Sequence, residues 1–285
     1  MPITFAFFNV QSEIPDRFVF KPGVFVFSPN LGKQSPTFQI QFFPPQPSFT
    51  AFVAFWNQQI QQEHQCRIFQ SVEMSLLGRT AHRVTYSTQH GSHVRFTDVF
   101  FLHLGKSFAR LALVGTFEEA QAVRKEWNQT LQSLAPAPFI PATEHRVWEK
   151  KNTFSGFGLT CTLPDGWADR TTYTFVSVQN PDVELEIKAD EQAHEETAKE
   201  KVDDFLVRMS GLLDNKSQTT DYGNWSDNSL NGFQAKVQYW EAKIPFLCHF
   251  AAFRPIPKTG FTVCVTGPQE TLATLPYVQF SLITP

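Results

Sequence analysis

Two stretches of the sequence match each other: residues 78–86 read GRTAHRVTY, and residues 232–239 read GFQAKVQY. Both begin at a glycine, continue as an alternating run and end on a tyrosine, a pattern typical of a half-buried β-strand. Val84 lies 31 residues before Gly115, and Val237 lies 30 residues before Gly267. Because this spacing is also kept, the sequence predicts a unit of about 130 residues that is present twice.

The same kinds of element follow in the same order around each copy of this strand. The first half predicts strands at 24–27, 38–42, 80–87, 93–103 and 107–114, and helices at about 49–64 and 116–134. The second half predicts strands at 171–178, 183–187, 233–241, 245–253 and 260–266, and helices at about 195–213 and 269–282. Ser48 is the expected N-cap of the first helix, and Thr116 with Glu119 forms a capping box. This pattern defines the class as α+β, an antiparallel sheet–helix sandwich built twice.

Prolines at positions 136, 138 and 141 interrupt the chain near its midpoint. Clustered prolines favour an extended, semi-rigid connection between domains. We therefore expect a divergent unit at 1–134, a proline-rich linker at 135–153 and a second unit at 154–285.

Composition excludes several classes of protein. The 285 residues are 42% hydrophobic, enough for a packed core, and the net charge of −3 argues against a nucleic-acid binder. The longest apolar run, residues 51–56, is far shorter than the roughly 20 residues of a membrane-spanning helix. The start of the sequence lacks the marks of a secretory signal, and the four cysteines show no CxxC spacing. We expect a cytoplasmic protein.

Residues 163–171 read LPDGWADRT and are followed by an alternating strand that ends in Phe175. This opening resembles that of the DcrB-like family of PsbP-like folds. Gly232, Ala235, Tyr239 and the pair Ser281-Leu282 fit later marks of that family. The resemblance covers about 157–282 well, whereas residues 5–134 lack the Gly-Trp pair.

The branch of this family without a signal peptide includes the Eag chaperones of type VI secretion, which act as homodimers. The resemblance implies two tandem PsbP-like sandwiches packed as a pseudo-dimer. It also implies a non-enzymatic chaperone or adaptor that holds the N-terminal, transmembrane-like helices of a secretion effector against paired concave sheet faces. Spike proteins would be further partners, and no nucleic acid, membrane insertion or cofactor is implied.

The expected client-binding surface consists of apolar strand faces. Its residues are Val24, Phe25, Val26, Phe27, Phe38, Ile40, Phe42, Tyr173, Phe175, Leu185 and Ile187. Alternate side chains of a strand share a face, so a strand with two apolar faces needs two coverings. Of the 30 phenylalanines, 20 lie in residues 1–140, which favours the first unit as the client-binding one. The sequence leaves open which face is exposed. Core packing is the simpler explanation of each residue taken singly, and a weaker one for the whole set.

Two other functions stay open. An accessory module, such as an immunity or scaffold component, would dock on a folded partner through a flatter patch with a few aromatic anchors. A small-molecule-binding or hydrolytic protein would need an enclosed pocket with converging polar groups.

Enzymatic and metal sites find little support. The sequence has no nucleophile elbow, Walker loop or dinucleotide fingerprint. Cys248 and His249 are neighbours in a strand, so their side chains point to opposite faces and cannot act as a pair. A group of histidines lacks the further ligands that a metal site needs: His82, His90, His93 and His103. We therefore expect no catalytic residues and no metal.

Overall fold

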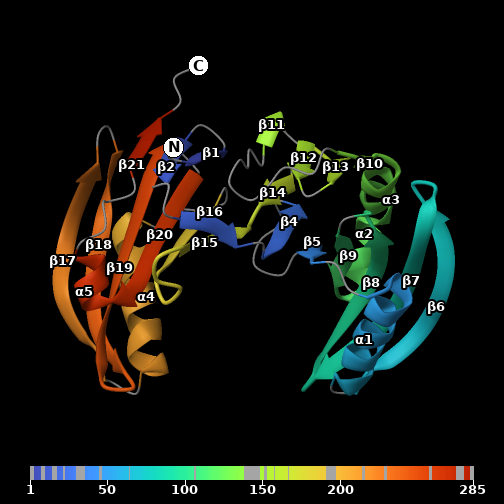
Figure 1. Cartoon of the computed structure of the whole chain (residues 1–285), viewed down its shortest axis with the longest axis horizontal. Coiled ribbons are helices and arrows are strands. Elements are labelled where there is room, and N and C mark those ends of the chain that lie inside the picture. Colours follow the sequence, from blue (N-terminus) through green and yellow to red (C-terminus); the bar gives the residue numbers. More distant parts are fainter. Residues whose placement is uncertain are drawn as a thin grey trace. The chain divides into compact units, whose positions relative to one another are not determined.

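The chain forms two seven-stranded antiparallel sheets, each in its own folding unit (Figure 1). The computed structural model describes residues 3–7, 10–14, 18–21, 23–29, 36–44, 47–63, 65–105, 107–137, 148–150, 153–156, 158–165, 167–190, 197–213, 216–227, 230–256, 259–273 and 279–282. Unit 1 comprises Met1–Pro22, Ala142–Val147 and Arg170–Pro285. Unit 2 comprises Gly23–Pro141 and Trp148–Asp169.

The large sheet of unit 2 has the strand order β14-β4-β5-β9-β8-β7-β6. Its strands are β4 (Val24–Pro29), β5 (Thr37–Phe43), β6 (Arg67–Leu76), β7 (Arg79–His90), β8 (His93–His103), β9 (Phe108–Gly115) and β14 (Trp167–Asp169). The helices are α1 (Phe49–Gln62), α2 (Phe117–Ala122) and α3 (Arg124–Gln132). A small sheet in the order β10-β13-β12-β11 completes the unit: β10 (Ala135–Pro136), β11 (Trp148–Lys150), β12 (Thr153–Gly156) and β13 (Leu159–Thr162).

Helix α1 covers one face of this sheet. Ser48 caps it as expected, because its Oγ accepts a hydrogen bond from the Ala51 N–H at 3.0 Å. The apolar side of the helix packs on alternate residues of β7, β8 and β9, and the Phe52 ring stacks on Phe108 at 4.8 Å. The apolar stripe of the helix, which repeats every 3.6 residues, thus packs on the apolar face of the strands, which repeats every two residues.

The opposite face is covered by α3 and the small sheet. Trp127 of α3 lies against Phe38 with ring centroids 5.0 Å apart. Phe154 of β12 packs on Phe25 at 4.9 Å and on Phe42 at 6.1 Å. Both coverings that the doubly apolar strands require therefore come from unit 2 itself.

The predicted helix at 116–134 divides into two. The capping box of Thr116 and Glu119 forms as expected and starts α2. At Val123 the backbone leaves helical geometry (φ −104°, ψ 16°), and α3 begins at the next residue. The break lets Ala120, Val123 and Trp127 all stay buried on the sheet.

Unit 1 repeats this architecture with the order β3-β15-β16-β20-β19-β18-β17. Its elements are β3 (Phe18–Lys21), β15 (Thr172–Ser177), β16 (Glu184–Asp190), α4 (Ala198–Leu212), β17 (Gln218–Asp227), β18 (Leu230–Glu241), β19 (Ile244–Ile256), β20 (Thr259–Pro268) and α5 (Gln269–Leu272). A three-stranded sheet of β1 (Ile3–Phe7), β2 (Val10–Ile14) and β21 (Gln279–Leu282) also belongs to it. Strand for strand, the order equals that of unit 2, which confirms the α+β class and agrees with a duplicated unit.

Helix α4 takes in unit 1 the place that α1 takes in unit 2. Thr197 and Glu200 form a capping box at its start. Val202 and Phe205 are buried against β18 and β19, and Phe205 stacks on Phe250 with centroids 4.2 Å apart. Tyr239 of β18 lies in this core as Tyr86 of β7 lies in the core under α1, so the two matched sequence stretches occupy equivalent places.

The edge strands of the two large sheets are exchanged between the halves of the sequence. β3 directly precedes β4 in the chain but pairs with β15, where Phe20 lies opposite Phe175. β14 directly precedes β15 but pairs with β4, where Asp169 lies opposite Phe27. Since β3 and β14 hold equivalent places in the repeat, each unit is completed by a strand from the other half.

Several expectations about the chain are corrected by this exchange and by neighbouring strands. The predicted domains were residues 1–134 and 154–285. The structural units divide the chain differently, because residues 1–22 belong to unit 1 and residues 154–169 belong to unit 2. Ala135-Pro136, expected to begin a linker, pair with Leu159 and Thr160 of β13. Residues 138–147 lie outside the described part of the chain. The boundaries of the evolutionary repeats stay a prediction.

The predicted C-terminal helix at 269–282 is confirmed at its start and wrong at its end. Helix α5 ends at Leu272, and residues 279–282 form β21, which pairs with β2. Pro276 lies outside the described residues. Strands β6 and β17, the outer neighbours of β7 and β18, were not predicted at all.

Candidate functional site

The predicted client-binding residues of the first half lie in the core of unit 2. Phe25, Phe27, Phe38, Ile40 and Phe42 are each at most 7% exposed. They share one sheet face, because Phe25 is paired with Ile40 and Phe27 with Phe38. Val24 and Val26 point to the opposite face and are half-buried.

This placement corrects the expectation of an open surface there. Phe154 covers Phe25, Phe27 and Phe42, while Trp127 covers Phe38. A role of these side chains in client binding stays a prediction, and it would require the contacts of Phe154 and Trp127 to open.

The predicted residues of the second half are buried as well. Tyr173, Phe175, Leu185 and Ile187 are at most 1% exposed. Phe175 is paired with Leu185 and Tyr173 with Ile187, so the four share the sheet face opposite α4. No described member of this set offers an apolar surface to a partner.

An exposed apolar strip lies instead at the β6 edge of unit 2. We call it the β6 patch and define it by five residues: Phe69, Val72, Met74, Val94 and Phe117, which are 37–56% exposed. Strand β6 is the last strand of its sheet in Figure 1. Exposed apolar side chains scattered singly are ordinary on protein surfaces, whereas a contiguous patch marks a binding site.

Strand register places the members of the patch on one face. Val72 is paired with Arg83 and Met74 with Ala81, and across β7 these residues lie opposite Phe100 and Leu102. This is the face on which α2 and α3 pack, and the helices leave its outer strands open. Along β7 the patch extends from the level of Gln89 to that of Ala81, about 26 Å.

Aromatic contacts fix the two central rings of the patch. Phe69 and Phe117 both lean on the buried ring of Phe96, with centroids at 6.4 and 5.6 Å. Arg67 lies over the Phe69 ring at 5.3 Å and adds a positive charge to one end. Phe69 projects at a β-bulge between Ile68 and Gln70, and bulges re-aim side chains at sheet edges.

A buried ion network supports the sheet beneath the patch. Asp98 of β8 is fully buried and accepts hydrogen bonds from Arg83 Nε and Nη2 at 2.8 and 2.9 Å. Arg124 Nη1 and Trp127 Nε1 donate to Asp98 Oδ2 at 2.5 and 3.3 Å. The hydrogen bonds to Asp98 raise the pKa of Arg83 above its ordinary value. The network therefore joins β7, β8 and α3 into one rigid support.

The residues considered for catalysis or metal binding are dispersed. Cys248 Sγ contacts Cys264 Sγ, while His249 Nε2 is bonded to Gln234 Oε1 on the other face, as strand alternation predicts. His82 Nε2 is bonded to Ser71 Oγ, and the His103 ring stacks on Phe108. Among the described residues, no three His, Cys, Asp or Glu side chains converge on a metal site.

No helix in the described part of the chain has the length and apolarity that crossing a membrane requires. This finding concerns helices alone, and the cytoplasmic location stays a prediction.

Several solved structures have a similar fold. The chain matches the Tle4–Tli4 complex at 12% identity with a TM-score of 0.55, over 94% of this chain and 86% of that one. It matches TplEi, an immunity protein of type VI secretion from Pseudomonas aeruginosa, at 12% identity with a TM-score of 0.51, over 94% of this chain and 88% of that one. The same protein complexed with an "L" peptide matches over 100% of this chain, at 13% identity.

These likenesses show a shared fold across both units. A match to cyanobacterial PsbP, at 13% identity over 44% of this chain and 85% of that one, has a TM-score of 0.30 and carries no argument. No family model and no curated protein matches the sequence. Membership of the PsbP-like or DcrB-like family and the resemblance to Eag chaperones therefore stay predictions.

The β6 patch escaped sequence reasoning although a signal was present. Residues 67–76 read RIFQSVEMSL, which alternates after the bulge and could have been recognised as a strand. Its apolar members were too few for a buried strand, and this pattern fits an edge strand with one partly open face.

Proposed function

We propose that this protein binds a folded protein toxin of a type VI secretion system and acts as its immunity protein. The observation that carries the proposal is the fold shared with the immunity protein TplEi over nearly the whole chain. It corresponds to the second of the functions that the sequence left open, an accessory module with no chemistry of its own.

The β6 patch is the surface we assign to the toxin. Two half-exposed phenylalanines, an arginine over one of them and a rigid ion network beneath them match the anatomy of a binding hot spot. The open edge of β6 offers backbone donors and acceptors to a partner strand as well. A flat patch with aromatic anchors is what docking on a folded partner requires.

The chaperone function stays a second prediction, together with the pseudo-dimer, the spike proteins and the apolar client helices. Its proposed contact residues are buried in both units, so it lacks an open surface among them. The immunity proposal needs no rearrangement of the described core.

Binding of the toxin encoded beside this gene tests the proposal. We expect a stable complex with the toxin, and an equally stable one with a toxin that lacks any N-terminal apolar helices. Each of Phe69→Ser and Phe117→Ser should weaken the complex roughly 30-fold, because a central aromatic anchor contributes about 2 kcal/mol. Calorimetric titration of purified proteins measures the change.

Phe55→Ser is the matched control. Phe55 is 54% exposed, close to the 53% of Phe69 and the 56% of Phe117, and it lies on α1 of the same unit outside the patch. It should leave the affinity unchanged. Binding that is lost with the N-terminal helices would support the chaperone instead. Equal affinities of all three variants would remove the patch from the interface.

A further inference from the structure

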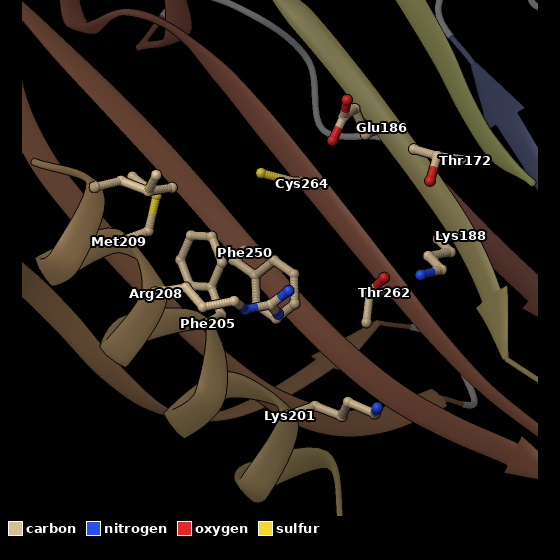
Figure 2. Close-up of a pocket in the computed structure, with 11 residues that line it drawn as sticks. Thr172, Glu186, Lys188, Lys201, Phe205, Arg208, Met209, Phe250, Thr262 and Cys264 are labelled. Carbon is tan, nitrogen blue, oxygen red and sulfur yellow. The ribbon is translucent and has the colours of Figure 1, made fainter. Parts of the chain in front are cut away.

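A cavity of about 400 Å³ opens in unit 1 between α4 and the sheet (Figure 2). Helix α4 lies over β18 and β19, so the same face of β15, β16 and β20 extends beyond it. The cavity lies beside α4, over the part of the sheet face that the helix leaves uncovered. Its volume falls in the range of small-molecule sites, about 300–1,000 Å³.

Charged side chains surround the opening of the cavity. Lys201 and Arg208 come from α4, and Lys188 comes from β16, as Figure 2 shows. Glu186 is the single carboxylate among the described residues of the lining, so three cations and one anion give these residues a net charge of +2. Arg208 Nε donates to the Asp204 carbonyl oxygen, which uses one of the five N–H groups of its guanidinium.

The inner part of the cavity is apolar. The stacked rings of Phe205 and Phe250 lie there, with Met209 beside them, whereas Leu212 is a largely exposed part of the lining. Thr172 and Thr262 add hydroxyl groups to the lining. Hydrogen bonding to Cys248 and burial raise the pKa of Cys264, so the thiol in the lining stays protonated at neutral pH.

The equivalent place in unit 2 is filled by an arginine. Thr262 of β20 is paired with Lys188 of β16, and the corresponding pair in unit 2 is Arg110 of β9 with Gln41 of β5. Arg110 lies over the Trp56 ring of α1 at 5.7 Å. A threonine side chain is shorter than an arginine side chain, which agrees with an open cavity at this place in unit 1.

We propose that this cavity binds a small amphiphilic anion, a molecule with one carboxylate, sulfonate or phosphate head and a short apolar chain. The cationic rim supplies charge-assisted hydrogen bonds to the head, and the aromatic floor removes the chain from water. The site lies in unit 1, whereas the proposed toxin surface lies in unit 2. The two proposals therefore rest on different residues.

Titration with octanesulfonate below its micellar concentration tests the site in the full-length protein. We expect one molecule bound per chain, and weaker or no binding of octanol and octyltrimethylammonium, which lack the anionic head. The double substitution Lys201→Gln/Arg208→Gln should lower the affinity at least tenfold. Octanoate and octyl phosphate, compared side by side, distinguish a carboxylate from a phosphate ligand.

Thr262→Phe fills the cavity without changing its charge and should abolish binding. Lys125→Gln, an exposed lysine on α3 of unit 2, is the control and should bind as the unaltered protein does. Thermal unfolding of every variant checks that it is folded. The Lys201→Gln/Arg208→Gln variant remains informative if Thr262→Phe fails this check. The proposal is overturned if octanol or octyltrimethylammonium binds as tightly as octanesulfonate. It is also overturned if the double variant binds octanesulfonate as tightly as the unaltered protein, or if the unaltered protein does not bind it.

Binding should also tighten as the pH falls. Burial and the neighbouring Glu184 raise the pKa of Glu186, while Lys21 and Lys188 act in the opposite sense. Lys201 and Arg208 of α4 and Cys264 of β20 line the same cavity. Protonation of Glu186 removes the only negative charge of the described lining, and the sulfonate keeps its own charge throughout. Glu186→Gln should bind more tightly at neutral pH and lose this dependence; an unchanged pH profile contradicts the role of Glu186.

Discussion

Residues 23–169, expressed alone, should fold cooperatively, whereas residues 1–134 should not. The first fragment contains every strand of the large sheet of unit 2, including β14, and its small sheet with Phe154. The second fragment follows the apparent sequence repeat but ends before β10, β12, β13 and β14. Phe25, Phe27 and Phe42 would then lose the ring that covers them.

The expected difference is large. Truncating a buried phenylalanine to alanine costs about 3–5 kcal/mol, a large part of the stability of an ordinary domain, and the shorter fragment loses the whole segment around Phe154. Circular dichroism, dispersion of amide resonances and a thermal unfolding curve distinguish the two fragments.

In the full-length chain, Phe154→Ala should lower the unfolding transition of unit 2 and spare that of unit 1. A 1–134 fragment that unfolds cooperatively at the same temperature as 23–169 would contradict the strand exchange.

Replacing Asp98 by alanine should destabilise unit 2 by about 3–5 kcal/mol. The carboxylate is fully buried, and its removal leaves Arg83, Arg124 and the indole N–H of Trp127 without their shared acceptor. Removing one partner of a buried ion pair leaves an uncompensated charge in the protein interior. The resulting loss of stability is larger than the net stabilisation that the intact pair provides. Chemical denaturation followed by tryptophan fluorescence measures the loss.

Glu184→Ala provides the comparison, because Glu184 forms an exposed ion pair with Lys21 at 2.8 Å. Exposed pairs contribute about 0–1 kcal/mol, so this substitution should cost little. Similar losses for the two variants would show that the Asp98 network is no more important than a surface pair. The Asp98 variant should also weaken toxin binding, since the β6 patch rests on the strands that this network joins.

Local chemistry made some parts of the fold predictable. Ser48, Thr116 and Glu119 start helices in the structure as their side chains require, and the periods of the sequence revealed the buried sides of α1 and α4. The duplicated order of elements could be inferred because the repeat preserves its spacing. Strands β6 and β17 were missed because edge strands bury little apolar surface.

The strand exchange and the covering of the phenylalanines left no local signal. The alternation of Phe25 and Phe27 shows that they share a face, but not that Phe154, more than 100 residues later, packs on it. A sequence period assigns a residue to a face and says nothing of what lies opposite. The predicted client surface and the β6 patch differ for this reason.

The exchanged strands also impose an order on folding during synthesis. When residue 169 has left the ribosome, every strand of unit 2 is available, while β3 still waits for β15 at residues 172–177. The N-terminal strands β1, β2 and β3 must therefore remain unpaired with unit 1 until most of the chain has been made, since domains form as their parts emerge. Unit 2 should therefore fold before unit 1, although unit 1 includes the N-terminal strands.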